Sequence, residues 1–212
     1  MPSEDTLHQG FRIGEHMPAA LLVQLFRNPR HKPAKRWAAL VALGAKPDAA
    51  ALEVLRETLR HDDWRFRRYA LEALRRHPRA AEAEADILRL LWDVDDQVRQ
   101  TALKVAGELD LRSTRGAILQ LLEAENPDVR DTALNTLAHL WSDEDFNRVL
   151  RMYRNETKRS VRIAAAKTLR KRASRDNWRR VFEDFAHDRE ARHRLWSCEL
   201  AAKFGTGSDL RR

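Results

Sequence analysis

One helix-like segment recurs along the whole chain at an almost constant interval. Four clear copies are "DDWRFRRYALEAL" (62–74), "DDQVRQTALKVAG" (95–107), "NPDVRDTALNTL" (126–137) and "KRSVRIAAAKTL" (158–169). Each contains an Arg followed by a pair of small or apolar residues, and the aligned arginines are 31 or 32 residues apart. A period of this length is typical of stacked supersecondary units. The sequence therefore predicts a repeat array. The aligned positions are Arg36, Arg67, Arg99, Arg130, Arg162 and Arg194.

Apolar residues follow each aligned Arg at helical spacing. In the second copy they are Ala70, Leu71 and Leu74, three, four and seven positions after Arg67. These offsets share one face of an α-helix, so this face is predicted to be the core seam. Another amphipathic stretch precedes each such helix. These stretches are 18–26, 50–59, 85–92, 115–122, 144–153 and 177–185.

Two helices of about three turns, with short connections, fill one period of the repeat. The composition agrees, because the chain has only 7 Gly and 7 Pro and is rich in Ala, Leu, Arg and Glu. The predicted fold is all-α, an α-solenoid of about six antiparallel helix pairs. We expect an arm or cap at 1–16, the array at 17–205 and a tail at 206–212.

The repeat resembles a known motif. An Asp-rich turn, Val-Arg, two variable positions and Ala-Leu, as in "PDVRDTAL" and "DDQVRQTAL", resemble the HEAT repeat. The short unit is similar to the HEAT-like repeats first named for phycobilisome lyases. This resemblance implies a superhelix whose second helices line the concave surface. It also implies that the six aligned arginines form a ladder, pairing with carbonyls and acidic groups of neighbouring turns; Asp63, Asp95, Asp96 and Asp128 are the candidate acids.

The sequence contains no recognisable catalytic constellation. It lacks His-Glu-x-x-His and Cys-x-x-Cys spacings and glycine-rich phosphate loops. The single cysteine, Cys198, is interpreted as a buried core thiol, and His187 and His193 as surface or capping residues. No catalytic residue, metal or cofactor is therefore expected. With no signal-like start and no membrane-length apolar stretch, the expected compartment is the cytoplasm, without membrane association.

Positive charge is concentrated near the C-terminal end. The chain has a net charge of +8, and residues 151–212 contain 18 Lys or Arg but only 8 Asp or Glu. On the fifth repeat, Lys167, Arg170 and Lys171 share a face opposite the core seam. Trp37 and Trp196 follow their aligned arginines closely and are predicted to point away from the seam. With equivalent positions in other repeats, the predicted partner-binding set is Arg76, Lys104, His139, Lys167, Arg170, Lys171, Lys203, Trp37 and Trp196.

Three functions are consistent with this pattern. The first is a non-enzymatic scaffold whose concave surface engages an acidic protein or peptide. The second is nucleic-acid binding, in which phosphates also contact Lys158, Arg159, Arg175, Arg179 and Arg180. The third is a HEAT-like DNA glycosylase, although no residues here match the active-site Asp and Trp of that family. A plain alternative is that the charged positions form solvated faces.

Overall fold

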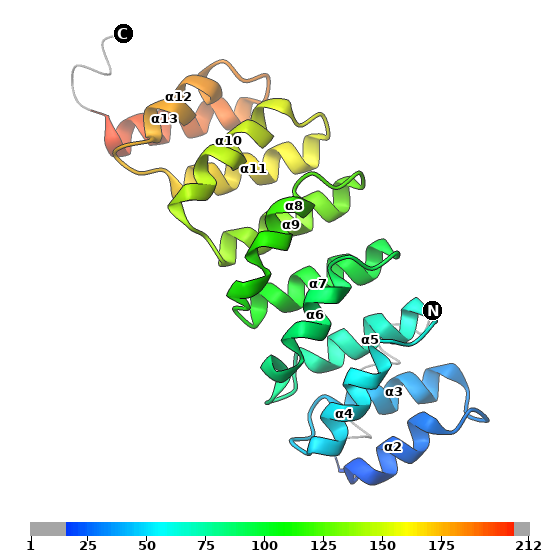
Figure 1. Ribbon diagram of the computed structural model, residues 1–212. Coiled ribbons are helices and arrows are strands. Elements are labelled where there is room, and N and C mark those ends of the chain that lie inside the picture. Colours follow the sequence, from blue (N-terminus) through cyan, green and yellow to red (C-terminus); the bar gives the residue numbers. More distant parts are fainter. Residues whose placement is uncertain (1–15, 206–212) are drawn as a thin grey trace. The chain divides into compact units, whose positions relative to one another are not determined.

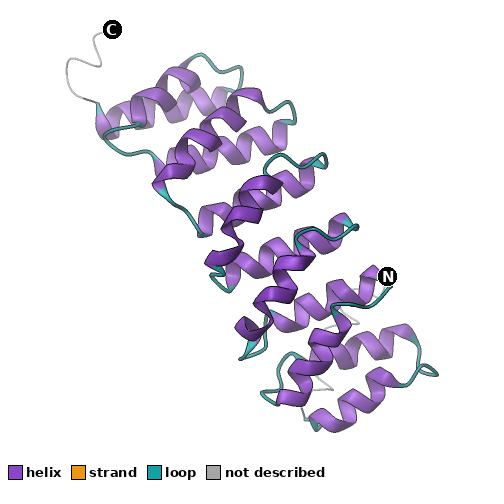
Figure 2. Cartoon of the chain, viewed as in Figure 1, coloured by secondary structure: helices purple, strands orange, loops and turns teal. Residues whose placement is uncertain are grey.

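The computed structural model of this chain describes residues 16–205, and every regular element among them is a helix (Figure 2). These residues form twelve α-helices and three short 3-10 helices, with no strand. The predicted all-α solenoid fold is confirmed. The predicted arm at 1–16, apart from its last residue, and the predicted tail at 206–212 lie outside the described residues.

The chain divides into two compact units, Met1–Leu121 and Leu122–Arg212, which we call the first and second units. Figure 1 labels the helices of both. The first unit contains α2 (Ala19–Arg27), α3 (Pro33–Leu43), α4 (Ala49–Thr58), α5 (Trp64–Leu74), α6 (Glu84–Leu90), α7 (Asp96–Glu108) and α8 (Arg115–Leu121). The second contains α9 (Pro127–His139), α10 (Phe146–Asn155), α11 (Arg159–Arg172), α12 (Trp178–Ala186) and α13 (Ala191–Phe204).

Helices pack in the same way within each unit. In the first unit α2 packs on α3, α4 on α5 and α6 on α7; in the second, α10 packs on α11 and α12 on α13. Within a unit, the second helix of one repeat also packs on the second helix of the next: α3 on α5 and α5 on α7 in the first unit, and α9 on α11 and α11 on α13 in the second. Neighbouring second helices therefore lie side by side within a unit.

The predicted core seam is buried. Ala70, Leu71 and Leu74 on α5 are 0% exposed, as are the equivalent Leu134 and Leu137 on α9. Burial of each Leu side chain contributes about 1.5–3 kcal/mol. Spacing on the helix is thus sufficient to identify the core of these hairpins.

Short polar residues begin several second helices. Asp63 accepts a hydrogen bond from the Arg65 amide at 3.0 Å, and Asn126 accepts one from the Asp128 amide at 2.8 Å. Such caps satisfy amides that have no partner within the helix. Before α6, α8 and α10, short 3-10 helices appear that the apolar spacing does not predict. They are Ala80–Ala83, Arg112–Thr114 and Asp143–Asp145.

Candidate functional site

Arg67 shows how an aligned arginine joins two repeats of the first unit. Its Nη1 donates to the carbonyls of His61 and Asp62, both at 2.8 Å. Its Nε and Nη2 donate to the carboxylate of Asp93 in the next repeat, at 2.7 and 2.6 Å. The side chains of Arg67 and Asp93 are only 10% and 6% exposed. One guanidinium therefore satisfies a turn in its own repeat and a buried acid in the next.

Arg130 repeats this geometry in the second unit. Its Nη1 donates to the carbonyls of Ala124 and Glu125 at 2.8 and 2.9 Å. Its Nε and Nη2 both lie 2.8 Å from the carboxylate of Glu156. Burial alone would raise the pKa of Glu156, but the bonds from Arg130 and nearby amides hold it below its ordinary value.

The other aligned arginines also donate to backbone carbonyls or carboxylates. Arg99 additionally contacts the carboxylate of Asp96 within its own helix. Arg162 pairs with Asp188, described below. The carbonyl acceptors are Phe26 for Arg36, Asp93 for Arg99, and Asp188 and Arg189 for Arg194.

The acids that pair between repeats are not the ones expected from the turn sequence. Asp63 and Asp95 cap helices instead, the latter accepting from the Gln97 amide at 2.9 Å. Between repeats the acceptors are Asp93, Glu156 and Asp188, each 26 residues after its arginine. Each of these three acids also accepts a hydrogen bond from the backbone amide two residues later, so one carboxylate holds an amide and a guanidinium at the same time.

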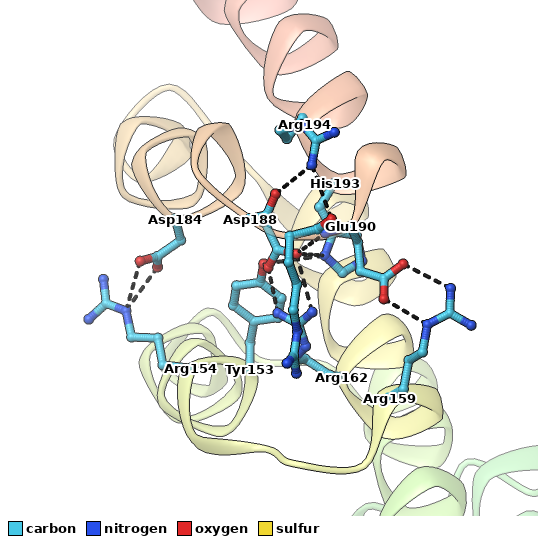
Figure 3. Close-up of polar contacts among 10 residues, drawn as sticks. Tyr153, Arg154, Arg159, Arg162, Asp184, Asp188, Glu190, His193 and Arg194 are labelled. Atoms are coloured by element: carbon cyan, nitrogen blue, oxygen red, sulfur yellow. Dashed lines mark hydrogen bonds and ion pairs between the residues drawn. The ribbon is translucent and has the colours of Figure 1, made fainter.

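Asp188 is the centre of a densely bonded cluster in the second unit (Figure 3). Arg162 donates to it at 2.5 and 3.2 Å, the Tyr153 hydroxyl also donates to it, and the Glu190 amide lies 2.7 Å away. Nδ1 of His193 is 3.3 Å from its carboxylate. These groups come from α10, α11 and the start of α13, so the cluster joins the last two repeats.

Burial and the contacts within the cluster shift the pKa of three of its groups. Burial opposes ionisation of Asp188, but its donors hold its pKa well below the ordinary range, whereas burial and Asp188 together raise the pKa of Tyr153. His193 is 0% exposed, and burial lowers its pKa despite the neighbouring Asp188. The interpretation of His193 as a surface or capping residue is therefore wrong. It packs between the rings of Phe185 and Trp196.

A cationic hollow lies between α11 and α13, and several predicted partner-binding residues line it. Its volume is about 480 Å³. Because α11 and α13 are neighbouring second helices, exposed side chains of both line the same hollow. The last turns of both helices are basic. Cations there also interact favourably with the helix dipole. The lining residues are Lys167, Arg170, Lys171, Trp196, Glu199, Leu200 and Lys203.

The hollow has an excess of positive charge. Four cations and one carboxylate line it, and Arg170 donates to that carboxylate, Glu199, at 2.7 Å. Within the described part of the chain, Lys167, Lys171 and Lys203 form no hydrogen bond or ion pair, and all three are exposed. We call this surface the α11–α13 hollow. Its three lysines can contact an anionic partner without giving up a hydrogen bond or ion pair of their own.

The expectation that Trp37 and Trp196 point away from the core is wrong. They are only 7% and 8% exposed. Trp37 packs on Phe66 and Tyr69 of α5, because a position beside the aligned Arg faces the neighbouring second helix rather than solvent. Trp196 is covered by the guanidinium of Arg170, 4.9 Å from its ring, and reaches the hollow only as part of its wall.

The remaining predicted partner-binding residues do not line the hollow. Lys104 is an exposed residue of α7, and Arg76 follows α5; both belong to the first unit. His139 ends α9 and is exposed in the second unit. The interpretation of Cys198 as a buried thiol is also wrong, because it is exposed on α13.

The structure divides the predicted phosphate-binding residues between the two ends of α11. A helix of its length, 14 residues, extends for about 21 Å. Arg159 is held by both carboxylate oxygens of Glu190, at 2.7 and 2.9 Å, and Arg180 donates to Asn147 at 2.6 Å. Lys158 and Arg159 lie at its start, and Arg175, Arg179 and Arg180 lie beyond its end.

The sequence pattern did not predict two features, both of which are contacts between repeats. Glu199 is 29 residues from Arg170, about one repeat length, and other surface pairs such as Arg154 with Asp184 have similar separations. The sequence signal for such ion pairs is two opposite charges about one repeat length apart. The second feature is Arg172, which donates to the Ala138 carbonyl at 2.6 Å and lies over Trp141, and so joins α11 to α9.

Residues 16–205 contain neither a candidate metal site nor a candidate membrane-spanning helix. No group of three or more His, Cys, Asp or Glu side chains there is placed to hold a metal ion. No helix in the same range is long and apolar enough to cross a membrane.

Solved structures of similar fold cover most of the chain. One chain in the complex of CpcE and CpcF of phycocyanin lyase from Nostoc sp. PCC7120 is 16% identical, with a TM-score of 0.62 over 90% of this chain and 78% of that one. An engineered protein is 18% identical, with a TM-score of 0.59 over 89% of this chain and 98% of its own. At these identities the similarity shows a shared fold alone. No curated protein matches the sequence.

The sequence itself matches a repeat family. The family model described as HEAT repeats matches residues 18–96 and again residues 84–170, which together span well over half of the chain. The matched residues include the helix pairs and the aligned arginines from Arg36 to Arg162 whose contacts are described above. This chain therefore belongs to the family of HEAT-repeat proteins.

Proposed function

We propose that the protein is a non-enzymatic binding scaffold whose α11–α13 hollow engages an acidic peptide segment of a partner protein. One observation carries the proposal: Lys167, Lys171 and Lys203 converge on a single hollow, and among the described residues none of the three forms a hydrogen bond or ion pair. Charged groups of this kind speed association and select partners of opposite charge. The indole of Trp196 and the side chain of Leu200 add an apolar wall, which suits a peptide with an apolar residue between its acids.

The same observations favour a peptide over nucleic acid. Phosphate binding along a strand needs a row of cations, whereas the candidate phosphate-binding residues are divided between the ends of α11 and partly engaged in ion pairs. Nucleic-acid binding is therefore the competing outcome of the experiment below.

The test is a triple charge reversal, Lys167→Glu with Arg170→Glu and Lys171→Glu. We expect it to weaken binding of a short labelled Asp- and Glu-rich peptide with one central Leu by at least roughly tenfold, because attraction becomes repulsion. Fluorescence anisotropy measures the affinity, and circular dichroism checks that the fold is retained. A titration with a labelled DNA strand runs in parallel.

The matched control reverses Arg175, Arg179 and Arg180, which changes the net charge equally but lies outside the hollow. It should retain peptide affinity within about twofold, the change expected from long-range screening alone. Equal losses in both variants would reject the hollow as the site. Tight DNA binding that is lost only in the control variant would instead support the nucleic-acid function.

A further inference from the structure

Glu199 already pairs with Arg170, the one arginine among the four cations that line the hollow. Of the four cations that line it, all within the described residues, Arg170 alone is ion-paired. Its guanidinium is held on one side by the Trp196 ring at 4.9 Å and on another by Glu199 Oε2 at 2.7 Å. The carboxylate of Glu199 therefore lies where a carboxylate of a bound acidic ligand would meet Arg170.

We infer that Glu199 is a resident carboxylate that an acidic peptide displaces from Arg170, so that this residue determines the affinity and charge selectivity of the hollow. The inference rests on the proposed function. In the bound state, one carboxylate of the peptide takes the place of Glu199 at Arg170, and other carboxylates of the peptide contact the three lysines.

The exposure of the pair makes the exchange feasible. The side chains of Arg170 and Glu199 are 42% and 48% exposed, and an ion pair this accessible to water contributes little to stability. The indole keeps the guanidinium oriented while its carboxylate partner changes. Displacement therefore does not require any buried group to move.

The same pair selects against weakly charged ligands. A ligand with one carboxylate gains nothing at Arg170, because it exchanges one carboxylate for another. A ligand with several carboxylates also reaches Lys167, Lys171 and Lys203, where no hydrogen bond or ion pair among the described residues has to be broken. In the unliganded hollow, Glu199 also repels each approaching carboxylate. Glu199 thus sets a minimum ligand charge.

The experiment is the Glu199→Gln variant, tested with the labelled acidic peptide described above. We expect its Kd to fall by roughly threefold to tenfold, since the competing carboxylate and its repulsion are removed together. The matched control is Glu183→Gln, an exposed acid of α12 outside the hollow. It carries the same charge change and should leave the Kd within about twofold, as expected from screened long-range charge.

A second background separates displacement from general repulsion. In Arg170→Gln, the additional change Glu199→Gln should improve affinity much less, because no guanidinium remains to be released. An equal improvement in both backgrounds would overturn displacement. If the wild-type protein binds the peptide and Glu199→Gln binds it with the same Kd, the inference is overturned but the proposed function is not. Absence of binding by both proteins would overturn the proposed function as well.

Discussion

Replacing Asp188 with alanine is expected to lower the free energy of unfolding by about 3 to 5 kcal/mol. Asp188 is the common acceptor for Arg162, the Tyr153 hydroxyl and the Glu190 amide. Alanine would leave the guanidinium of Arg162, which is 10% exposed, without its counter-charge. A buried charge that loses its partner costs far more than the pair contributes when intact.

Urea unfolding followed by circular dichroism measures this loss. The control is Asp184→Ala, near the end of α12, where the carboxylate pairs with the 47% exposed Arg154 at 2.8 Å. That change should cost about 1 kcal/mol or less, because water replaces an exposed partner. Similar decreases in the free energy of unfolding for the two variants would show that the Asp188 cluster stabilises the fold no more than an exposed ion pair does.

Arg67→Ala should have an effect of comparable size in the first unit, about 3 to 5 kcal/mol. It removes two bonds to the buried Asp93 and two to the carbonyls of His61 and Asp62. The carboxylate of Asp93 would keep only its bond from the Asp95 amide among the contacts described. The packing between two repeats therefore loses its main polar link.

Arg65→Ala is the matched control for Arg67, because it removes the same side chain two residues earlier on α5. Arg65 is 47% exposed and pairs with Asp63 within its own repeat. We expect a loss of about 1 kcal/mol or less from chemical denaturation. A loss for Arg67→Ala no larger than that for Arg65→Ala would mean that the aligned arginines do not hold repeats together.

The fold was predictable because it depends on spacing. Residues three, four and seven positions after an aligned Arg, such as Ala70, Leu71 and Leu74, must share a helical face, and this face is buried. The short 3-10 helices, such as Ala80–Ala83, were not predictable in the same way. They are single turns set by how the chain enters the next helix, and they carry no periodic pattern.

The candidate site was predictable only in part. Lys167, Arg170 and Lys171 share one face of α11, and the packing of α11 beside α13 brings Lys203 to the same hollow. The burial of Trp37 was missed because spacing within one helix does not show which side meets a neighbouring helix. Glu199 was missed for the same reason, since its role depends on a contact between repeats.

The most direct test of the central claim is to map the bound peptide on the protein by NMR. The acidic peptide is titrated into isotope-labelled protein, and changes in backbone amide and lysine side-chain signals are followed. The account predicts that the largest changes fall on the C-terminal half of α11 and on α13, with Lys167, Lys171 and Lys203 among them. Changes centred on Arg175 to Arg180, or on the first unit, would contradict it.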